Sequence, residues 1–143
     1  MSPKTRILAI DYGEKRIGLA VSDPLKLFAK PLKVIPNQGF DLILEELRPV
    51  IREFDIELVL VGMPYAIEGG NTPKTEETMA FREKLDASLD TPVLAWDERY
   101  STSEAKEELI KMGYTWKESR AIRDAMAAAM ILKSYLESRG EGS

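Results

Sequence analysis

The sequence predicts an α/β protein in which a five-stranded mixed sheet carries helices on both faces. Short apolar, β-branched segments joined by tight connections open the chain, and such a pattern is typical of antiparallel strands. Two later apolar segments each follow a segment with helical periodicity, which is typical of parallel strands reached by a helical crossover. The expected order is therefore β-β-β-α-β-α-β-α-α.

The first three strands are expected to form a meander. The segments Thr5–Asp11 and Arg16–Ser22 are rich in β-branched and apolar side chains. Tyr12–Lys15 between them contains Gly13 and predicts a tight turn, so the two strands should be antiparallel. Leu32–Ile35, which is bounded by two prolines, is the expected third strand.

The first crossover helix is predicted from apolar residues that recur on one helical face between Ile43 and Phe54. Pro49 falls inside this pattern, so we expect a kink or a break there. The continuous apolar run Leu58–Val61 predicts a central strand that is covered on both faces.

The second crossover is predicted from capping signals. Thr72 followed by Pro73 is typical of a helix start, and this helix should run to about Leu89. Pro92–Trp96 predicts the last strand, which is also a buried one.

Two helices are expected to complete the domain. The segment Ser101–Glu104 fits a capping box, and Gly113 predicts a helix stop. Thr115–Glu118 fits a second capping box before a helix that ends at about Leu136. The all-apolar stretch Ala125–Leu132 indicates that this helix is buried. We expect one domain over residues 1–138 and a frayed tail at 139–143.

Composition excludes several classes of chemistry. Histidine and cysteine are both absent from the 143 residues, which excludes thiol nucleophiles, a histidine base, zinc–thiolate sites and disulfides. The net charge is −4, so any nucleic-acid surface must be a local patch. No apolar stretch approaches the roughly 20 residues of a membrane span, and no signal peptide is evident, so we expect a cytoplasmic protein without membrane contact.

Three acidic positions interrupt apolar elements. Asp11 ends the first strand, Asp97 and Glu98 end the last, and Asp124 precedes the all-apolar stretch of the final helix. Ligands bind at the carboxyl ends of strands in open α/β sheets, so these acids would form an oxygen-only cation site if they converge. Taken singly, each is more often a turn, cap or ion-pair residue, and Arg120 or Arg123 would be the ion-pair partner of Asp124.

Basic residues flank these acids, and such an arrangement suits a polyanionic substrate held by its phosphates. Tyr114 and Trp116 follow Lys111 and would stack on bases, although packing residues of this kind are common. Ordinary solvated charge explains any single lysine equally well. The candidate phosphate contacts are Lys15, Arg16, Arg99 and Arg123.

Four motifs, in order and at fitting spacing, give the chain a resemblance to the YqgF/RuvX family of the RNase H-like superfamily. The resemblance spans nearly the whole chain. Ser101 departs from the usual threonine and Met63 from the usual leucine. The motifs are Asp11-Tyr12-Gly13-Glu14-Lys15-Arg16-Ile17-Gly18-Leu19-Ala20, Val61-Gly62-Met63-Pro64 with Gly69, Asp97-Glu98-Arg99-Tyr100-Ser101-Thr102, and Asp124-Ala125 with Ala127-Ala128.

The resemblance implies an RNase H-like fold and a metal-dependent phosphodiesterase. Family members are described as Holliday junction resolvases and as nucleases that mature the 5′ end of pre-16S rRNA. By motif match, the catalytic and metal-binding acids are Asp11, Glu98 and Asp124, which would hold two Mg²⁺ or Mn²⁺ ions. Asp97 and Glu98 point to opposite faces of a strand, so Asp97 is not expected to bind the same ion.

Three alternatives remain open at this stage. A junction resolvase would act as a stable homodimer, whereas an rRNA nuclease could be a monomer. On the basis of the family, we favour the rRNA nuclease. A binding module on the same fold would keep the acids and lack turnover. The hairpin from Asp11 to Gly18 also fits actin-like kinases and ATPases, but those need two domains of this size.

Overall fold

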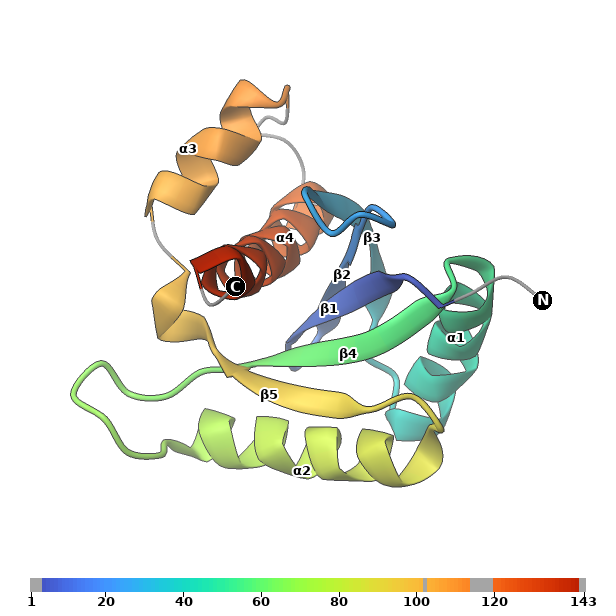
Figure 1. Ribbon diagram of the computed structural model, residues 1–143. Helices are drawn as coiled ribbons and strands as arrows, with labels where there is room; N and C mark the ends of the chain where they lie inside the picture. Colours follow the sequence, from blue (N-terminus) through green and yellow to red (C-terminus); the bar gives the residue numbers. More distant parts are fainter. Residues whose placement is uncertain (1–3, 102, 114–119, 142–143) are drawn as a thin grey trace.

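The computed structural model describes residues 4–101, 103–113 and 120–141, and within them one five-stranded sheet has the order β3-β2-β1-β4-β5 (Figure 1). Strands β1, β2 and β3 are antiparallel neighbours, and β1, β4 and β5 are parallel. This is the predicted mixed sheet. The strands are β1 (Arg6–Tyr12), β2 (Arg16–Ser22), β3 (Ala29–Pro36), β4 (Ile56–Met63) and β5 (Val93–Asp97).

Helices cover both faces of the sheet, as predicted. Figure 1 shows α1 and α2 on one side, and α4 lying across the other side with α3 beyond it. The helices are α1 (Phe40–Glu53), α2 (Pro73–Ser88), α3 (Ser103–Lys111) and α4 (Arg120–Glu141), and a 3-10 turn, η1 (Glu98–Tyr100), follows β5.

Two hydrophobic clusters hold these layers together, one on each face of the sheet. Because successive strand residues point to opposite faces, Leu8 and Ile10 of β1 join the cluster under α1 and α2. Ile7 and Ala9 join the cluster under α4. Asp11 continues the second series, so its side chain emerges on the α4 face.

Helix α1 corrects one prediction, because Pro49 lies inside a continuous helix of 14 residues and does not break it. Proline removes one backbone donor and costs roughly 3 kcal/mol or more in a helix interior. The helix buries Ile43, Leu47 and Val50 against the sheet, and burial of an apolar face outweighs local propensity.

The start of α2 is as predicted and more strongly capped than the sequence motif indicated. The Thr72 hydroxyl accepts a hydrogen bond from the Thr75 backbone N–H, and the Thr75 hydroxyl accepts one from the Thr72 N–H. The Thr75 hydroxyl also donates to the carbonyl oxygen of Pro64 at 2.7 Å. This contact ties the first turn of α2 to the end of β4.

Other boundaries shift. Strand β3 includes both flanking prolines, which an edge strand tolerates because its outer N–H groups need no partner. Ser101 ends η1 and α3 begins at Ser103, so the first capping box is misplaced. Gly113 follows α3 with a φ of 101°, as a helix stop requires. The second capping box lies outside the described residues.

The final helix is longer than predicted and extends to Glu141. Its Ala125, Met126, Ala128 and Ala129 are buried against the sheet, as the all-apolar stretch indicated. Among the described residues, none of the helices is long and apolar enough to cross a membrane.

Candidate active site

Two of the predicted acids meet at the carboxyl edge of the sheet on the face covered by α4. Asp11 lies near the end of β1, and Glu98 follows the end of β5. Trp96 packs into the cluster under α4, and Glu98 in η1 reaches the same face, since it lines one cavity with residues of α4. Strand β4 lies between β1 and β5, so both carboxylates border its last residues.

Gly62 on β4 leaves the room that this meeting requires. A Cβ atom at Gly62 would lie 2.4 Å from Ile131 Cδ1 of α4 and 3.4 Å from Glu98 Oε2. A side chain here would force the Ile131 side chain to move and would bring an atom into contact with the Glu98 carboxylate.

Gly18 on β2 likewise allows a close approach, here between the β2 backbone and the backbone of α4. Gly18 pairs with Asp11 across the β1–β2 ladder, and a Cβ atom on it would lie 2.0 Å from the backbone oxygen of Asp124. The absence of a side chain therefore lets the first turns of α4 rest directly on β2, which brings Asp124 toward the site.

A cavity of about 220 Å³ opens beside the two acids. Its polar lining is Asp11, Glu98, Lys74 from the first turn of α2, and Ser101. Residues of α4 form the apolar wall. The Ser101 Oγ atom is shielded from solvent and has no hydrogen-bond partner among the described residues.

The pKa values of both carboxyl groups are raised, that of Asp11 by a large amount. Burial is the largest cause that raises the pKa of Asp11, and the charges of Glu98 and Asp124 also raise it while Lys74 lowers it; together they move it from 3.8 to about 7. Burial also raises the pKa of Glu98, again against the effect of Lys74. Perturbed carboxyls of this kind in a cavity are typical of functional sites.

Asp124 is close enough to affect Asp11, but its carboxylate does not line the cavity. Its Oδ2 atom accepts a hydrogen bond of 2.8 Å from Arg16 Nε on β2. The sequence suggested Arg120 or Arg123 as the ion-pair partner of Asp124, and it suggested that Arg16 contacts phosphate. The structure instead joins Asp124 to Arg16.

Asp97 and Arg99 lie apart from the cavity lining. Arg99 donates hydrogen bonds to both carboxylate oxygens of Asp97, at 2.6 to 3.0 Å, and one to the Ala66 carbonyl. This pairing lowers the pKa of Asp97, chiefly through the hydrogen bonds from Arg99. Asp97 is therefore a paired carboxylate beside the unpaired Glu98.

The structure describes two of the remaining residues that the sequence proposed as nucleic-acid contacts and does not describe the other two. Lys15 in the β1–β2 turn and Arg123 on α4 are exposed. Tyr114 and Trp116, which the sequence proposed for base stacking, lie outside the described residues.

Sequence reasoning missed Lys74 and the buried hydroxyl of Ser101. One signal was available for Lys74, because a cation in the first turn of a helix opposes the helix macrodipole. Such a residue needs a compensating anion, and Asp11 and Glu98 supply it. The signal for Ser101 came from the tertiary packing alone.

The residues of this cavity fit a divalent cation. Asp11 and Glu98 offer only oxygen donors, and their mutual proximity leaves negative charge that Lys74 neutralises in part. Mg²⁺ and Mn²⁺ prefer such ligands. Among the described residues, no three acidic side chains are already clustered closely enough to hold an ion.

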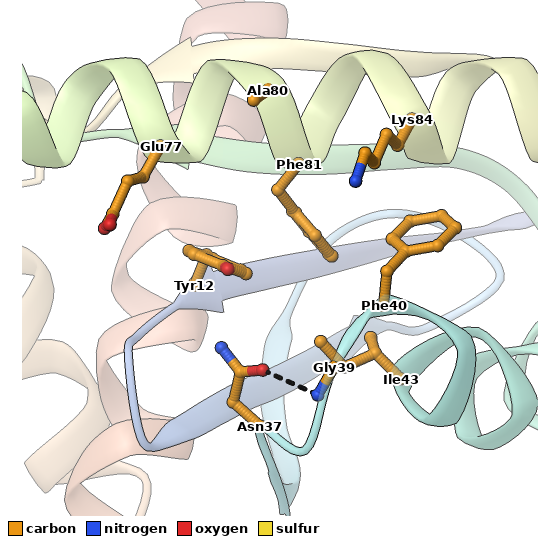
Figure 2. Close-up of a pocket in the computed structure, with 9 residues that line it drawn as sticks. All are labelled: Tyr12, Asn37, Gly39, Phe40, Ile43, Glu77, Ala80, Phe81 and Lys84. Carbon is orange, nitrogen blue, oxygen red and sulfur yellow. Dashed lines mark hydrogen bonds between the residues drawn. The ribbon is translucent and has the colours of Figure 1, made fainter.

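A second cavity, of about 270 Å³, lies on the opposite face between β1, α1 and α2 (Figure 2). Tyr12 stacks on Phe81 at 4.4 Å between ring centroids, and Phe40 meets Phe81 edge-on at 6.2 Å. Asn37 is satisfied internally, since it accepts from the Gly39 N–H and donates to the Gly13 carbonyl. This cavity contains none of the predicted site residues.

Comparison with known proteins places the chain in a family. A sequence model of the family described as "RuvX: Holliday junction resolvase" matches residues 5–138. A protein of Halothermothrix orenii named "Putative pre-16S rRNA nuclease" is 40% identical over 131 residues, covering 92% of this chain and 94% of that protein. A protein of Geobacillus kaustophilus with the same name is 40% identical over 136 residues, covering 94% and 99%.

Solved structures agree on the fold. Thermus thermophilus RuvC in complex with Holliday junction substrate matches with a TM-score of 0.61 at 17% identity, over 94% of this chain and 96% of that one. A yeast mitochondrial Holliday junction resolvase matches with a TM-score of 0.60 at 13% identity, over 99% and 81%. The sheet order and the helices on both faces are those of the RNase H-like fold.

Proposed function

This chain belongs to the RuvX family, and from that premise we propose that it is a nuclease that hydrolyses phosphodiester bonds of nucleic acid with the help of Mg²⁺ or Mn²⁺, two ions in all. The observation that carries the proposal is the cavity in which Asp11 and Glu98 meet at the carboxyl edge of the sheet. Both are partly buried carboxyls with raised pKa values, and a cation would relieve their repulsion.

The chain's own residues would bind and orient the reactants. A bound divalent cation supplies Lewis-acid chemistry, because it acidifies water and offsets charge on the phosphate. Asp11 and Glu98 would hold it, and we propose Asp124 as the third ligand because its charge is near enough to raise the pKa of Asp11. The chain has no histidine to act as a base, and water acidified by a bound cation would lose its proton to solvent without one.

Flanking phosphates would be held by the basic residues around the site. Lys15 and Arg123 are exposed and available for this role. Arg16 and Arg99 are each bonded to a carboxylate, so a phosphate would replace that partner on binding.

The 5′ end of pre-16S rRNA is the substrate we favour, because relatives at 40% identity over most of both chains carry the name of that activity. Processing of this precursor belongs to ribosome assembly in the cytoplasm. The specific observation for the alternative is the shared fold with junction resolvases. A resolvase would act on DNA as a homodimer and make paired cuts.

A side-by-side cleavage assay tests the proposal. The purified protein is incubated separately with a 5′-extended pre-16S rRNA fragment and with a four-way DNA junction, each in the presence of Mg²⁺, Mn²⁺ or EDTA. We expect metal-dependent trimming of the RNA that Asp11→Asn and Glu98→Gln each reduce at least a hundredfold. Asp86→Asn, which alters an exposed carboxylate on α2, is the matched control and should cleave normally.

Each result of this assay has a consequence. Paired cuts in the junction with intact RNA would show that the protein is a junction resolvase and not an rRNA nuclease. Tight binding of either substrate without turnover in any metal would indicate a binding module instead of an enzyme.

A further inference from the structure

Lys74 is the cation that the structure brings to the two acids. It lines the same cavity as Asp11 and Glu98, and it comes from the first turn of α2. The capping bonds of Thr72 and Thr75 fix that turn, and the bond from Thr75 to the Pro64 carbonyl anchors it to β4. The backbone that carries Lys74 is therefore held in place at the edge of the site.

The basic residues singled out in the sequence do not line this cavity. Arg16 is bonded to Asp124, and Arg99 is bonded to Asp97. Among the described residues that form the cavity wall, Lys74 is the one with a positive charge.

The charge of the cavity changes sign when a divalent cation binds. Two carboxylates and one ammonium group leave a net charge of about −1 when all are ionised, and a divalent cation converts this to about +1. Lys74 is then no longer needed to neutralise the acids. One phosphodiester group, with its single negative charge, would neutralise the cavity that holds the first ion and would offset part of the positive charge once the second ion is bound.

Ser101 adds an unsatisfied donor to the same wall. Its Oγ atom is buried without a hydrogen-bond partner, although buried polar atoms are nearly always paired. Because the Oγ atom is shielded as it stands, the Ser101 side chain would turn toward the cavity to donate to a non-bridging phosphate oxygen. The cavity of about 220 Å³ is far larger than the 10–15 Å³ that one water molecule requires, so it can admit such a group.

We infer that Lys74 and Ser101 form a phosphate-binding subsite that holds one backbone phosphate of a polynucleotide strand against the metal-loaded acids. This inference rests on the proposed function, because it takes the substrate to be a nucleic acid. Lys74 donates from its ammonium group and Ser101 from its hydroxyl, each to a non-bridging oxygen. Both residues bind substrate, and neither is required for metal binding.

The first test measures binding of a fluorescent single-stranded RNA by anisotropy across a salt series, in Ca²⁺, with a gel to verify that the RNA stays intact. We expect Lys74→Met to weaken binding about tenfold and to reduce the slope of log K against log salt by about 0.7, the value for one phosphate contact on a single strand. Lys74→Arg should restore most of the affinity.

Lys84→Met is the matched control for charge. Lys84 lies on the same helix but over the Phe40 ring at 5.8 Å, beside the second cavity. Its removal should leave both affinity and slope unchanged. Equal losses in Lys74→Met and Lys84→Met would overturn the inference, since Lys74 would then be ordinary surface charge.

Ser101→Ala distinguishes a role of Ser101 in RNA binding from a role in protein stability. Removal of a buried hydroxyl that has no partner should leave the melting temperature unchanged or raise it, while RNA binding weakens several-fold. A lower melting temperature with normal binding would show that Ser101 has a structural role only, which contradicts the inference.

A second test locates the phosphate. A methylphosphonate, which is neutral, replaces each phosphate of the RNA in turn. One position should weaken binding to the wild type and leave binding to Lys74→Met unaffected, and this coupling should vanish in EDTA. The absence of any coupled position would overturn the subsite.

These outcomes are distinct from failure of the nuclease itself. If the wild type shows Lys74-coupled binding and cleaves neither RNA nor junction, the subsite stands and the proposed activity is wrong. If cleavage depends on Asp11 but Lys74→Met binds and cleaves like the wild type, the nuclease stands and the subsite is wrong.

Discussion

Asp11 shows how a single residue of this site weakens the fold that carries it. Its pKa is raised to about 7, so the folded protein binds this proton more tightly than the unfolded chain does. The Asp11 proton therefore contributes its full stabilisation of the folded state below about pH 4. This contribution is lost as the pH rises toward 7. Above pH 7 the ionised carboxylate costs at most roughly 4 kcal/mol relative to an unperturbed one.

Asp11→Asn should remove this cost. In EDTA, we expect the variant to melt at a higher temperature than the wild type at pH 8, and the difference to shrink as the pH falls to 4. Thermal unfolding followed by circular dichroism measures it. Asp97→Asn is the control of opposite sign: its pKa is lowered by Arg99, so its substitution should destabilise the protein at pH 7. A pH-independent effect of Asp11→Asn would contradict the argument.

Arg16 competes with a metal ion for Asp124 if Asp124 is the third ligand. Arg16→Met removes the ion pair at 2.8 Å, so we expect Mn²⁺ affinity to increase several-fold, as measured by calorimetric titration. Arg99→Met, which frees Asp97 instead, should leave Mn²⁺ affinity unchanged. An unchanged affinity in Arg16→Met would remove Asp124 from the ligand set.

At the scale of elements, the contact between α4 and β2 depends on Gly18. A methyl group there would lie 2.0 Å from the Asp124 carbonyl oxygen, which is backbone and cannot rotate away. Gly18→Ala should therefore destabilise the fold by about 3 kcal/mol and displace the start of α4. Urea denaturation gives the free energy of unfolding, and a loss below about 1 kcal/mol would contradict such a close approach.

Two elements differ from what local sequence patterns predict. Pro49 predicted a kink or break in α1, but the apolar face of that helix holds it against the sheet without a break. Gly62 looked like the end of a strand in the sequence, whereas the structure places it inside β4, beneath Ile131. In both cases packing between elements, which local sequence does not report, decided the outcome.

For the whole molecule, the site predicts that divalent metal stabilises the fold. A cation that binds only the folded state adds about 2.7 kcal/mol at a hundred times its dissociation constant, which corresponds to a rise of roughly 10 °C in melting temperature for a chain of this size. The rise should be larger at pH 8 than at pH 5, because at pH 5 the ion must displace a proton from Asp11.

The measurement is a melting curve at increasing Mg²⁺, with Asp11→Asn as the comparison. The variant should gain far less than the wild type at the same concentration. An equal gain in the two proteins would place the stabilising ion elsewhere on the molecule.

The sequence alone determined the order of the strands and helices, the mixed sheet and the family, because hydrophobic periodicity, capping residues and motif spacing are local properties. It also predicted that Asp11 and Glu98 belong to the site, since acids end or follow two apolar strands and the family motifs single out these two together with Asp124. The tertiary structure decided what surrounds them. Lys74 and Ser101 reach the acids, and Arg16 reaches Asp124, only through contacts between residues distant in the chain. Such partners follow from packing geometry, which no local pattern encodes.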